Sequence, residues 1–280
     1  MSRNESPFPS AAENDGISYY ESGSGGRPVL LLHGGGIDSA SLSWRYLLPE
    51  LAKTRRVIAP NFPGYGGSEP LDGPHAVADL GLSLIAFLNR IELSEADVVG
   101  VSMGGGIAIW LALEHPERVA RLVPVAPYGL QSYAPLHFLS FLASRLPLDR
   151  ASFVAMRASE RVTRRVLGTI FADPSLIDDP LVAEVLKTVR SSDAGSAFAD
   201  FQRGEVGPRR LATVLMDRVH EIRHPTLFIH GCNDRLVPLS AVKEAMRRME
   251  NARLEVLDAG HWPMREQPGI FNAVVRNFLI

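Results

Sequence analysis

The sequence predicts an α/β fold in which a doubly wound, mainly parallel sheet is interrupted by an inserted helical cap. Apolar runs of strand length alternate with segments of helical periodicity over residues 17–127 and again over residues 206–280. Residues 128–205 instead contain helix-like segments and no convincing strand, so we expect them to form the cap on a single core. Residues 1–16 are polar and are expected to form a mobile tail.

Five segments before the cap have the character of strands. Residues 17–21 suit an edge strand, and the continuous apolar run at residues 28–32 is typical of a central strand covered on both faces. A helix is expected at residues 76–91, where apolar residues recur at steps of three and four. The remaining expected elements are strands at 56–59, 98–101 and 119–126, a helix at 44–51 and a buried helix after residue 102.

The alternation of strands and helices resumes after the cap. In a doubly wound sheet the ligand site lies outside the carboxyl ends of the strands. The loops that follow strands are therefore where we look for chemistry. The expected elements are a helix at 211–219, a strand at 226–229, a helix at 240–249, a strand at 253–257 and a closing helix from 268.

Composition and charge exclude several classes of function. Hydrophobic residues make up 46% and charged residues 21% of the 280 positions, the balance of an ordinary soluble globular protein. A formal net charge of -2 gives no global attraction to nucleic acid or an anionic membrane, and no apolar run approaches the ~20 residues of a membrane span. The single cysteine rules out an internal disulfide, so we expect a cytoplasmic protein that acts on a small molecule.

A serine between small residues marks the junction of the strand at 98–101 with the helix that follows it. The run Gly100-Val101-Ser102-Met103-Gly104 is typical of a strand that turns sharply into a helix with the serine at the bend. Strand and helix approach closely at such a bend, which favours glycine. The pattern alone also fits an ordinary turn, so the assignment depends on the rest of the chain.

Ser102, Asp234 and His261 each follow an expected strand, so the topology brings all three to one edge of the sheet. A serine hydroxyl is a weak nucleophile at neutral pH. It needs a base within hydrogen-bond reach, and that base needs an acceptor that fixes its tautomer. Serine, aspartate and histidine meet this requirement. Asp258 is a competing acid, but it lies so near His261 in the sequence that we expect a turn residue.

A reaction at a carbonyl group also needs two hydrogen-bond donors for the oxyanion that forms. The backbone N–H of Met103, directly after the serine, is one candidate. The other is expected from the glycine loop after residue 32, where missing side chains let the backbone approach a substrate. We favour Gly35, with Gly36 as second choice, and expect His33 to brace this loop by hydrogen bonding.

Five motifs now lie in one order along the chain. They are His33-Gly34-Gly35-Gly36, Pro63-Gly64-Tyr65-Gly66-Gly67-Ser68, Gly100-Val101-Ser102-Met103-Gly104-Gly105, Asp234-Arg235-Leu236-Val237-Pro238 and Gly260-His261-Trp262-Pro263. With them the chain resembles the α/β-hydrolase superfamily, in the branch with a helical cap, from about residue 17 to the C-terminus. The resemblance implies that Ser102 is the nucleophile, His261 the base and Asp234 its orienting acid, with no metal or organic cofactor.

The residues beside the serine bear on the reaction class. Ser102 excludes the haloalkane dehalogenase and epoxide hydrolase branches, which resemble this layout but use an aspartate nucleophile. Carboxylic ester hydrolases remain, together with carbon–carbon bond hydrolases that cleave dienoic acids from aromatic ring fission. Met103 and Trp262 suit the second group. Those enzymes usually have asparagine where this chain has Val101, however, and their cap arginine has no clear match here.

We therefore expect a serine hydrolase of small or medium, largely apolar carboxylic esters, working through an acyl-enzyme on Ser102. Carbon–carbon bond hydrolysis and lactone hydrolysis are the alternatives. The oligomeric state stays open.

The substrate pocket is expected between cap and sheet. Trp262 adjoins the base and Val101 the nucleophile, and Tyr128, Phe138 and Phe141 are aromatic residues of the cap, so these five are expected to line it. The cap aromatics equally suit a helix core. Six cap arginines suit either an anionic substrate or a solvated helix face: Arg145, Arg150, Arg157, Arg161, Arg164 and Arg165.

Two rival functions are weaker. His220-Glu221-Ile222-Arg223-His224 matches the H-E-x-x-H motif of zinc peptidases, in which both histidines share one face of a helix. Pro225 follows at once and disfavours helical geometry at His224, so we expect a frayed helix end and no metal site. A catalytically silent ligand receptor on the same fold has no support, because the serine, base, acid and glycine loop are all present.

Overall fold

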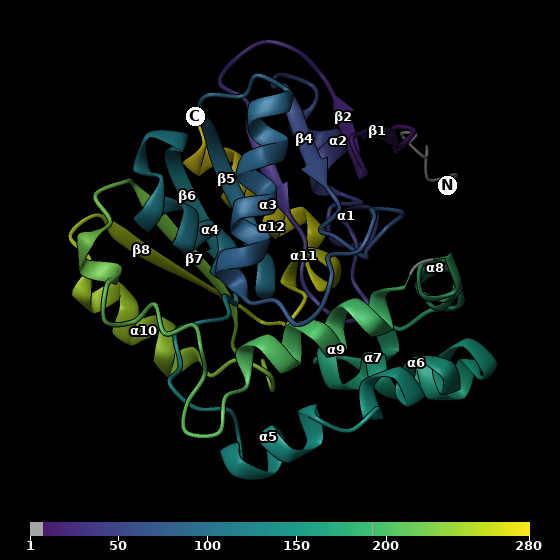
Figure 1. Cartoon of the computed structure of the whole chain (residues 1–280). Coiled ribbons are helices and arrows are strands. Elements are labelled where there is room, and N and C mark those ends of the chain that lie inside the picture. Colours follow the sequence, from purple (N-terminus) through teal and green to yellow (C-terminus); the bar gives the residue numbers. More distant parts are fainter. Residues whose placement is uncertain (1–7, 192) are drawn as a thin grey trace.

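The computed structural model describes residues 8–191 and 193–280, which form an eight-stranded sheet flanked by helices (Figure 1). The strand order is β1-β2-β4-β3-β5-β6-β7-β8. The pairs β1 with β2 and β2 with β4 are antiparallel and the other pairs are parallel, which confirms the predicted fold class. The strands are β1 (Ala12–Asn14), β2 (Ile17–Ser22), β3 (Val29–Leu32), β4 (Val57–Pro60), β5 (Ala96–Val101), β6 (Val119–Val125), β7 (Thr226–Gly231) and β8 (Ala252–Leu257).

The helices fall into two groups. Figure 1 shows those between β6 and β7 below the sheet, apart from the helices that pack on it. These cap helices are α5 (His137–Ser144), α6 (Leu148–Ala158), α7 (Glu160–Ile170), α8 (Asp179–Ser191) and α9 (Ala194–Glu205). The others are α1 (Ala40–Ser43), α2 (Leu47–Leu51), α3 (Val77–Arg90), α4 (Met103–Glu114), α10 (Leu239–Arg248), α11 (Pro263–Glu266) and α12 (Pro268–Phe278). In the described part of the chain no helix is long and apolar enough to cross a membrane.

The expected N-terminal tail is too long. Residues 12–14 form β1, which pairs with β2 through the partners Ala12 and Tyr19. Asp15 and Gly16 connect the two strands with φ of 47° and 76°, the positive values that a two-residue hairpin turn requires and that an Asp-Gly pair adopts readily. Residues 1–7 of the expected tail lie outside the described residues.

The helix expected at residues 211–219 does not form. Its backbone N–H groups are used elsewhere: Leu211 donates to Ser132, Ala212 to Glu205 and Leu215 to Gly129, each to the backbone oxygen. This segment therefore ties the start and end of the cap together, and only a short 3₁₀ turn, Val219–Glu221, follows it. Likewise the helix expected at 44–51 begins earlier and is divided into α1 and α2.

The centre of the sheet is a fully buried platform. Every residue of β3 and β5 is buried; β3 is wholly apolar, and β5 is apolar or small apart from Asp97. Helix α4 starts directly after β5 and packs on β5 and β6 with nearly all its residues buried. The loops that leave β3 and β5 are thus held by the best-packed part of the molecule.

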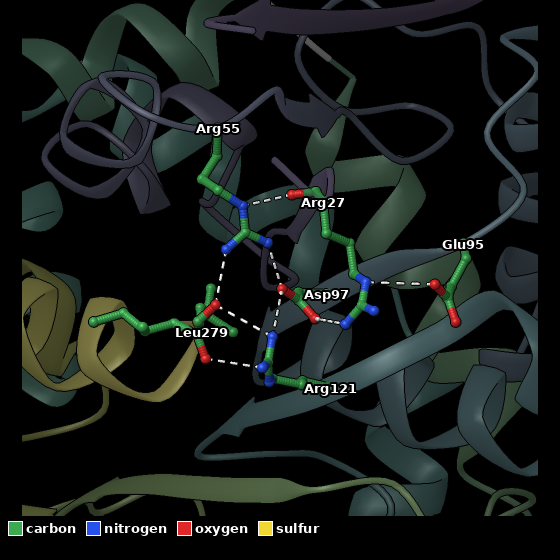
Figure 2. Close-up of polar contacts among 7 residues, drawn as sticks. Arg27, Arg55, Glu95, Asp97, Arg121 and Leu279 are labelled. Atoms are coloured by element: carbon green, nitrogen blue, oxygen red, sulfur yellow. Dashed lines mark hydrogen bonds and ion pairs between the residues drawn. The ribbon is translucent and has the colours of Figure 1, made fainter. Parts of the chain in front are cut away.

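Asp97, in β5, gathers three arginines at the amino edge of the sheet (Figure 2). Arg55 donates to Asp97 Oδ2 at 2.5 Å, while Arg121 and Arg27 lie 3.5 Å and 3.7 Å from its carboxylate oxygens. Arg55 and Arg121 also donate to the backbone oxygen of Leu279, just after α12, at 2.8 Å and 3.2 Å. The cluster fastens the C-terminal helix to the edge opposite the carboxyl ends of the strands.

Candidate active site

Ser102 occupies a strained bend between β5 and α4. Its backbone angles, φ of 53° and ψ of -116°, lie in a region that residues other than glycine rarely adopt. A Cβ on Gly100 would lie 2.2 Å from the oxygen of Gly104, and one on Gly104 would lie 2.4 Å from the oxygens of Leu32 and His33. Glycine is therefore required on both sides of the bend, as the nucleophile-elbow pattern predicts.

Asp234 and His261 come together from adjacent strand ends, after β7 and β8. His261 Nδ1 lies 2.8 Å from Asp234 Oδ2, and both side chains are almost fully buried. Since a carboxylate only accepts, Nδ1 carries the proton and Nε2 is left as an acceptor. The other carboxylate oxygen, Oδ1, accepts the backbone N–H groups of Leu236 and Val237 at 2.8 Å and 3.1 Å.

The surroundings of Asp234 keep it ionised. Burial raises the pKa of its carboxyl, but the hydrogen bond and positive charge of His261 and the two backbone amides outweigh burial, so that the pKa is lowered. A second histidine, His230, lies behind the acid with Nε2 3.5 Å from Asp234 Oδ2 and donates to the oxygen of Val237 at 3.0 Å. His230 lies within β7, four residues before the acid, where no motif in the sequence marks it as a partner of Asp234.

The glycine loop after β3 lies against the same serine. A Cβ on Gly34 would be 3.5 Å from Ser102 Cβ, and one on Gly35 would be 3.4 Å from Met103 Sδ, so the loop backbone approaches the start of α4 closely. His33 braces the loop as expected: Nδ1 donates to the oxygen of Gly34 at 2.6 Å. Its Nε2 accepts the backbone N–H of Phe62 at 2.9 Å.

One cavity of about 350 Å³ joins these groups between the core and the cap. The core side carries the serine, the histidine and the glycine loop, and the cap side carries apolar side chains with a few polar ones. The residues that line the cavity include Gly34, Gly35, Gly36, Ser102, Met103, Tyr128, Asp149, Ser152, Phe153, Phe198, Phe201, Gln202, His261 and Trp262.

Comparison with known proteins decides the family. Residues 27–268 match the family described as the alpha/beta hydrolase fold. The chain belongs to the α/β-hydrolase fold family.

Several relatives of this α/β hydrolase are themselves named as hydrolases. It is 34% identical to a 2-hydroxymuconate semialdehyde hydrolase of Pseudomonas sp. (strain CF600), over 93% of this chain and 89% of that protein. It is 32% identical to a 2-hydroxy-6-oxo-2,4-heptadienoate hydrolase of Pseudomonas putida F1, over 91% and 89%. A solved meta-cleavage product hydrolase from Pseudomonas fluorescens IP01 superposes with a TM-score of 0.76 at 28% identity, covering 94% of this chain and 93% of that one.

Three of the expected pocket residues lie elsewhere in the hydrolase. Trp262 and Tyr128 line the cavity, but Val101, Phe138 and Phe141 are absent from its described wall. Val101 is fully buried in β5 because its side chain points into the sheet core and away from the bend. Phe138 is 62% exposed on α5, and Phe141 lies under the guanidinium of Arg145.

The cap arginines do not reach the cavity either. Arg145 donates to the backbone oxygens of Arg203 and Val206 at 2.8 Å and 3.1 Å, and Arg164 to that of Ile177 at 2.7 Å. These two guanidinium groups therefore hydrogen-bond to backbone oxygens within and beside the cap and stabilise its fold. Aromatic residues that the sequence analysis did not select line the cavity instead: Phe153, Phe198 and Phe201. Helical periodicity could not have chosen among these cap residues, because it does not show how the helices are oriented.

The H-E-x-x-H sequence does not form the helix of a zinc peptidase. The 3₁₀ turn ends at Glu221, and Ile222 is extended with ψ of 120°, so His220 and His224 do not follow one helical face. The Glu221 carboxylate instead pairs with Arg218 at 2.9 Å. No group of three or more potential metal ligands occurs among the described residues.

His33 makes the stability of the fold depend on pH. Burial lowers the pKa of its imidazole to about 4, partly opposed by its bond to Gly34. As pH falls below ~6.5 the unfolded imidazole takes up a proton that the folded one does not, so the folded state loses up to about 3 kcal/mol by about pH 4. Urea unfolding from pH 4 to 7 of the wild type and His33→Gln checks this. The stability advantage of the wild type should shrink as pH falls; a constant difference would contradict it.

Proposed function

We propose that this chain is a serine hydrolase that cleaves a carbon–carbon bond next to the carbonyl group of a 6-oxo-2,4-dienoate. The observation that carries the proposal is the 34% identity, over 93% of the chain, to a protein named 2-hydroxymuconate semialdehyde hydrolase. This reverses the order expected from the sequence, in which ester hydrolysis came first. Ser102, His261 and the glycine loop share one cavity, which supports either reaction.

In this proposal the three catalytic side chains have separate roles. Ser102 Oγ attacks the substrate carbonyl carbon, and His261 Nε2 accepts its proton. Asp234 does not take part in proton transfer. It holds Nδ1–H at 2.8 Å, which fixes the tautomer and stabilises the imidazolium that forms.

The oxyanion is assigned to backbone donors on two elements. The Met103 N–H stands at the start of α4, and the second donor is the N–H of Gly35, with Gly36 as the alternative, in the loop that lines the same cavity. Donors that are fixed before the reaction lose no free energy in reorganising as charge develops.

Collapse of the tetrahedral adduct then breaks the bond between the carbonyl carbon and the neighbouring chain carbon. Before the attack the 2-hydroxy group of the substrate ketonises as its proton moves to C5, so the 2-oxo group receives the electron pair of the broken C5–C6 bond through the conjugated chain. The His261 imidazolium then donates its proton to the enolate oxygen, which gives the 2-hydroxydienoate and leaves Nε2 free to deprotonate water. The acyl group remains on Ser102 until water, deprotonated by His261, releases it as a carboxylic acid. Both steps use only side chains and backbone groups of this chain, so the proposal needs no metal or organic cofactor.

The experiment is a comparison of kcat/KM values for purified protein. 2-Hydroxy-6-oxo-2,4-heptadienoate is followed through loss of its absorbance, and a graded series of p-nitrophenyl esters and an enol-lactone are measured beside it. We expect the dienoate to have the highest kcat/KM. Rapid ester or lactone turnover with feeble dienoate cleavage would overturn the proposal in favour of the second candidate.

That second candidate is hydrolysis of a neutral ester or lactone, and the charge of the cavity wall favours it. Asp149 of the cap lines the cavity, and no arginine or lysine lines it among the described residues. Burial raises the pKa of the Asp149 carboxyl, with Arg203 acting in the opposite direction. A substrate carboxylate therefore finds no cation on this wall, whereas an uncharged ester does not need one.

Asp149 should select against anionic substrates. Replacing it with asparagine removes one negative charge and is expected to raise kcat/KM for the dienoate and for p-nitrophenyl hemisuccinate about fivefold at pH 7.5, with little change for p-nitrophenyl butyrate. Ser152→Ala, on the same helix and the same wall, is the matched control and should leave the ratio unchanged. An anionic-to-neutral ratio that is equal in Asp149→Asn and wild type would contradict this role.

A further inference from the structure

Asp38 is a fully buried carboxyl group beside the glycine loop, and no described residue forms an ion pair with it. Its Oδ2 accepts the backbone N–H of Gly34 at 2.8 Å and the hydroxyl of Ser43 at 2.5 Å. Its Oδ1 accepts the backbone N–H of Ser39 at 2.8 Å. Three donors thus converge on one buried side chain, which satisfies its hydrogen-bonding capacity without a countercharge.

These contacts divide into two kinds. Ser39 is the N-cap of α1 and Ser43 its last residue, so two of the donors belong to the helix that follows Asp38. The third, Gly34, belongs to the loop that faces Ser102. The side chain therefore connects α1, which is packed into the core, to the loop that carries the proposed oxyanion donors.

The geometry at Gly34 shows how close this connection is to the nucleophile. A Cβ built on Gly34 would lie 2.8 Å from Asp38 Oδ2 and 3.5 Å from Ser102 Cβ. A side chain at position 34 would thus meet the carboxyl group and the serine at once, so Gly34 lies between them with no room for one. The Gly34 N–H belongs to the peptide between His33 and Gly34, one peptide before the one that carries the Gly35 N–H, so the carboxyl group holds the start of the glycine loop.

The carboxyl is held there at an energetic cost. Burial raises its pKa to about 6, although the Ser43 hydroxyl, the two amides and the more distant Arg265 act to lower it. Arg265 itself is engaged with the oxygen of Leu42 at 2.8 Å and with Glu184 of the cap. A neutral side chain could cap α1 and close the turn before it without the cost of burying an ionisable group. Capping α1 alone therefore does not explain why an aspartate stands at position 38.

We propose that Asp38 is a positioning residue that holds the glycine loop in the arrangement needed to stabilise the oxyanion. The inference rests on the proposed use of Gly35 or Gly36 as donor, and it applies to any carbonyl substrate. Because these donors act on charge that develops in the transition state, loosening the loop lowers kcat and leaves KM nearly unchanged.

The test compares three variants with p-nitrophenyl butyrate: Asp38→Ala, Asp38→Asn and Ser43→Ala. Asp38→Ala should lower kcat about 10-fold to 100-fold with KM within about twofold, since small misplacement of catalytic groups has effects of this size. Asp38→Asn keeps one acceptor oxygen and should recover most of the loss. Ser43→Ala removes a donor on the α1 side only and should keep kcat within about twofold of wild type while lowering the urea concentration at the midpoint of unfolding.

The rate of inactivation by a serine-directed phosphonate gives a second readout, since a tetrahedral phosphoryl oxygen needs the same donors. It should fall in parallel with kcat. Equal kcat losses in Asp38→Ala and Ser43→Ala, or a rise in KM at constant kcat, would overturn the inference.

If Asp38→Ala does not fold, Asp38→Ser supplies the same comparison, because the serine side chain is shorter and does not span to the Gly34 N–H. Ser102→Ala in the same assay separates the cases: an active Ser102→Ala refutes the proposed function, whereas an inactive Ser102→Ala with an unimpaired Asp38→Ala refutes this inference alone.

Discussion

Replacement of Ser102 by alanine is expected to lower kcat by about 10³-fold or more for every substrate of this protein. The change removes one oxygen atom and leaves the bend, the His261–Asp234 pair and the glycine loop in place. The residual rate comes from the oxyanion donors and substrate binding alone. Steady-state turnover of the dienoate and of p-nitrophenyl butyrate measures the effect.

Alanine also relieves little of the strain at φ of 53°, so stability should change by less than about 1 kcal/mol. Ser152→Ala, which removes a hydroxyl from the cap wall of the same cavity, is the matched control and should keep kcat within a few-fold of wild type. Near-normal turnover of a folded Ser102→Ala protein would refute the assignment of the nucleophile.

The largest effect on stability is expected at Glu205, the last residue of α9. This fully buried carboxylate accepts the N–H of Val77 at 2.8 Å and both the hydroxyl and the N–H of Thr213, at 2.6 Å and 3.0 Å. It also accepts the Tyr128 hydroxyl at 3.1 Å. Burial and the neighbouring Glu205 charge raise the pKa of Tyr128, which keeps that phenol protonated as a donor.

Glu205→Ala leaves four donors without their acceptor, of which the Val77 N–H is buried and the other three are partly buried. Each unsatisfied group costs about 1 kcal/mol or more, so we expect a loss of about 3 kcal/mol or more from the free energy of unfolding. Glu205→Gln retains one oxygen and the side-chain volume and should lose less. Urea unfolding followed by fluorescence and circular dichroism measures both. A loss below about 1 kcal/mol in Glu205→Ala would show that the contacts between cap and core do not depend on this residue.

The order of residues along the chain was enough to bring the three expected catalytic residues to one edge of the sheet. Ser102, Asp234 and His261 each follow a segment that was expected to be a strand and is one, and parallel strands bring their carboxyl ends together whatever lies between them. The glycines around the serine also predicted the sharp bend correctly, because the close contact of Gly100 with Gly104 leaves no room for a side chain. Local sequence and parallel topology therefore sufficed for this part.

The wall of the cavity could not be found in this way. Phe138 and Phe153 are both cap aromatics on helices, yet the first is mostly exposed and the second lines the cavity. Which face of a cap helix turns inward depends on how α5 to α9 pack on one another and on the core. That packing involves contacts distant in sequence, and helical periodicity carries no information about it.

By itself the sequence determined the α/β fold, the place of the cap in the chain and the expected nucleophile, base and acid, because strand and helix patterns are local, and an alternation of strands and helices leads to parallel pairing with all carboxyl ends at one edge. The tertiary structure alone decided that Asp149 and Phe198 line the cavity, that the cap arginines do not, and that Asp38 and Glu205 are buried acceptors. A buried carboxyl looks like any other acidic residue until the chain folds and brings its donors together.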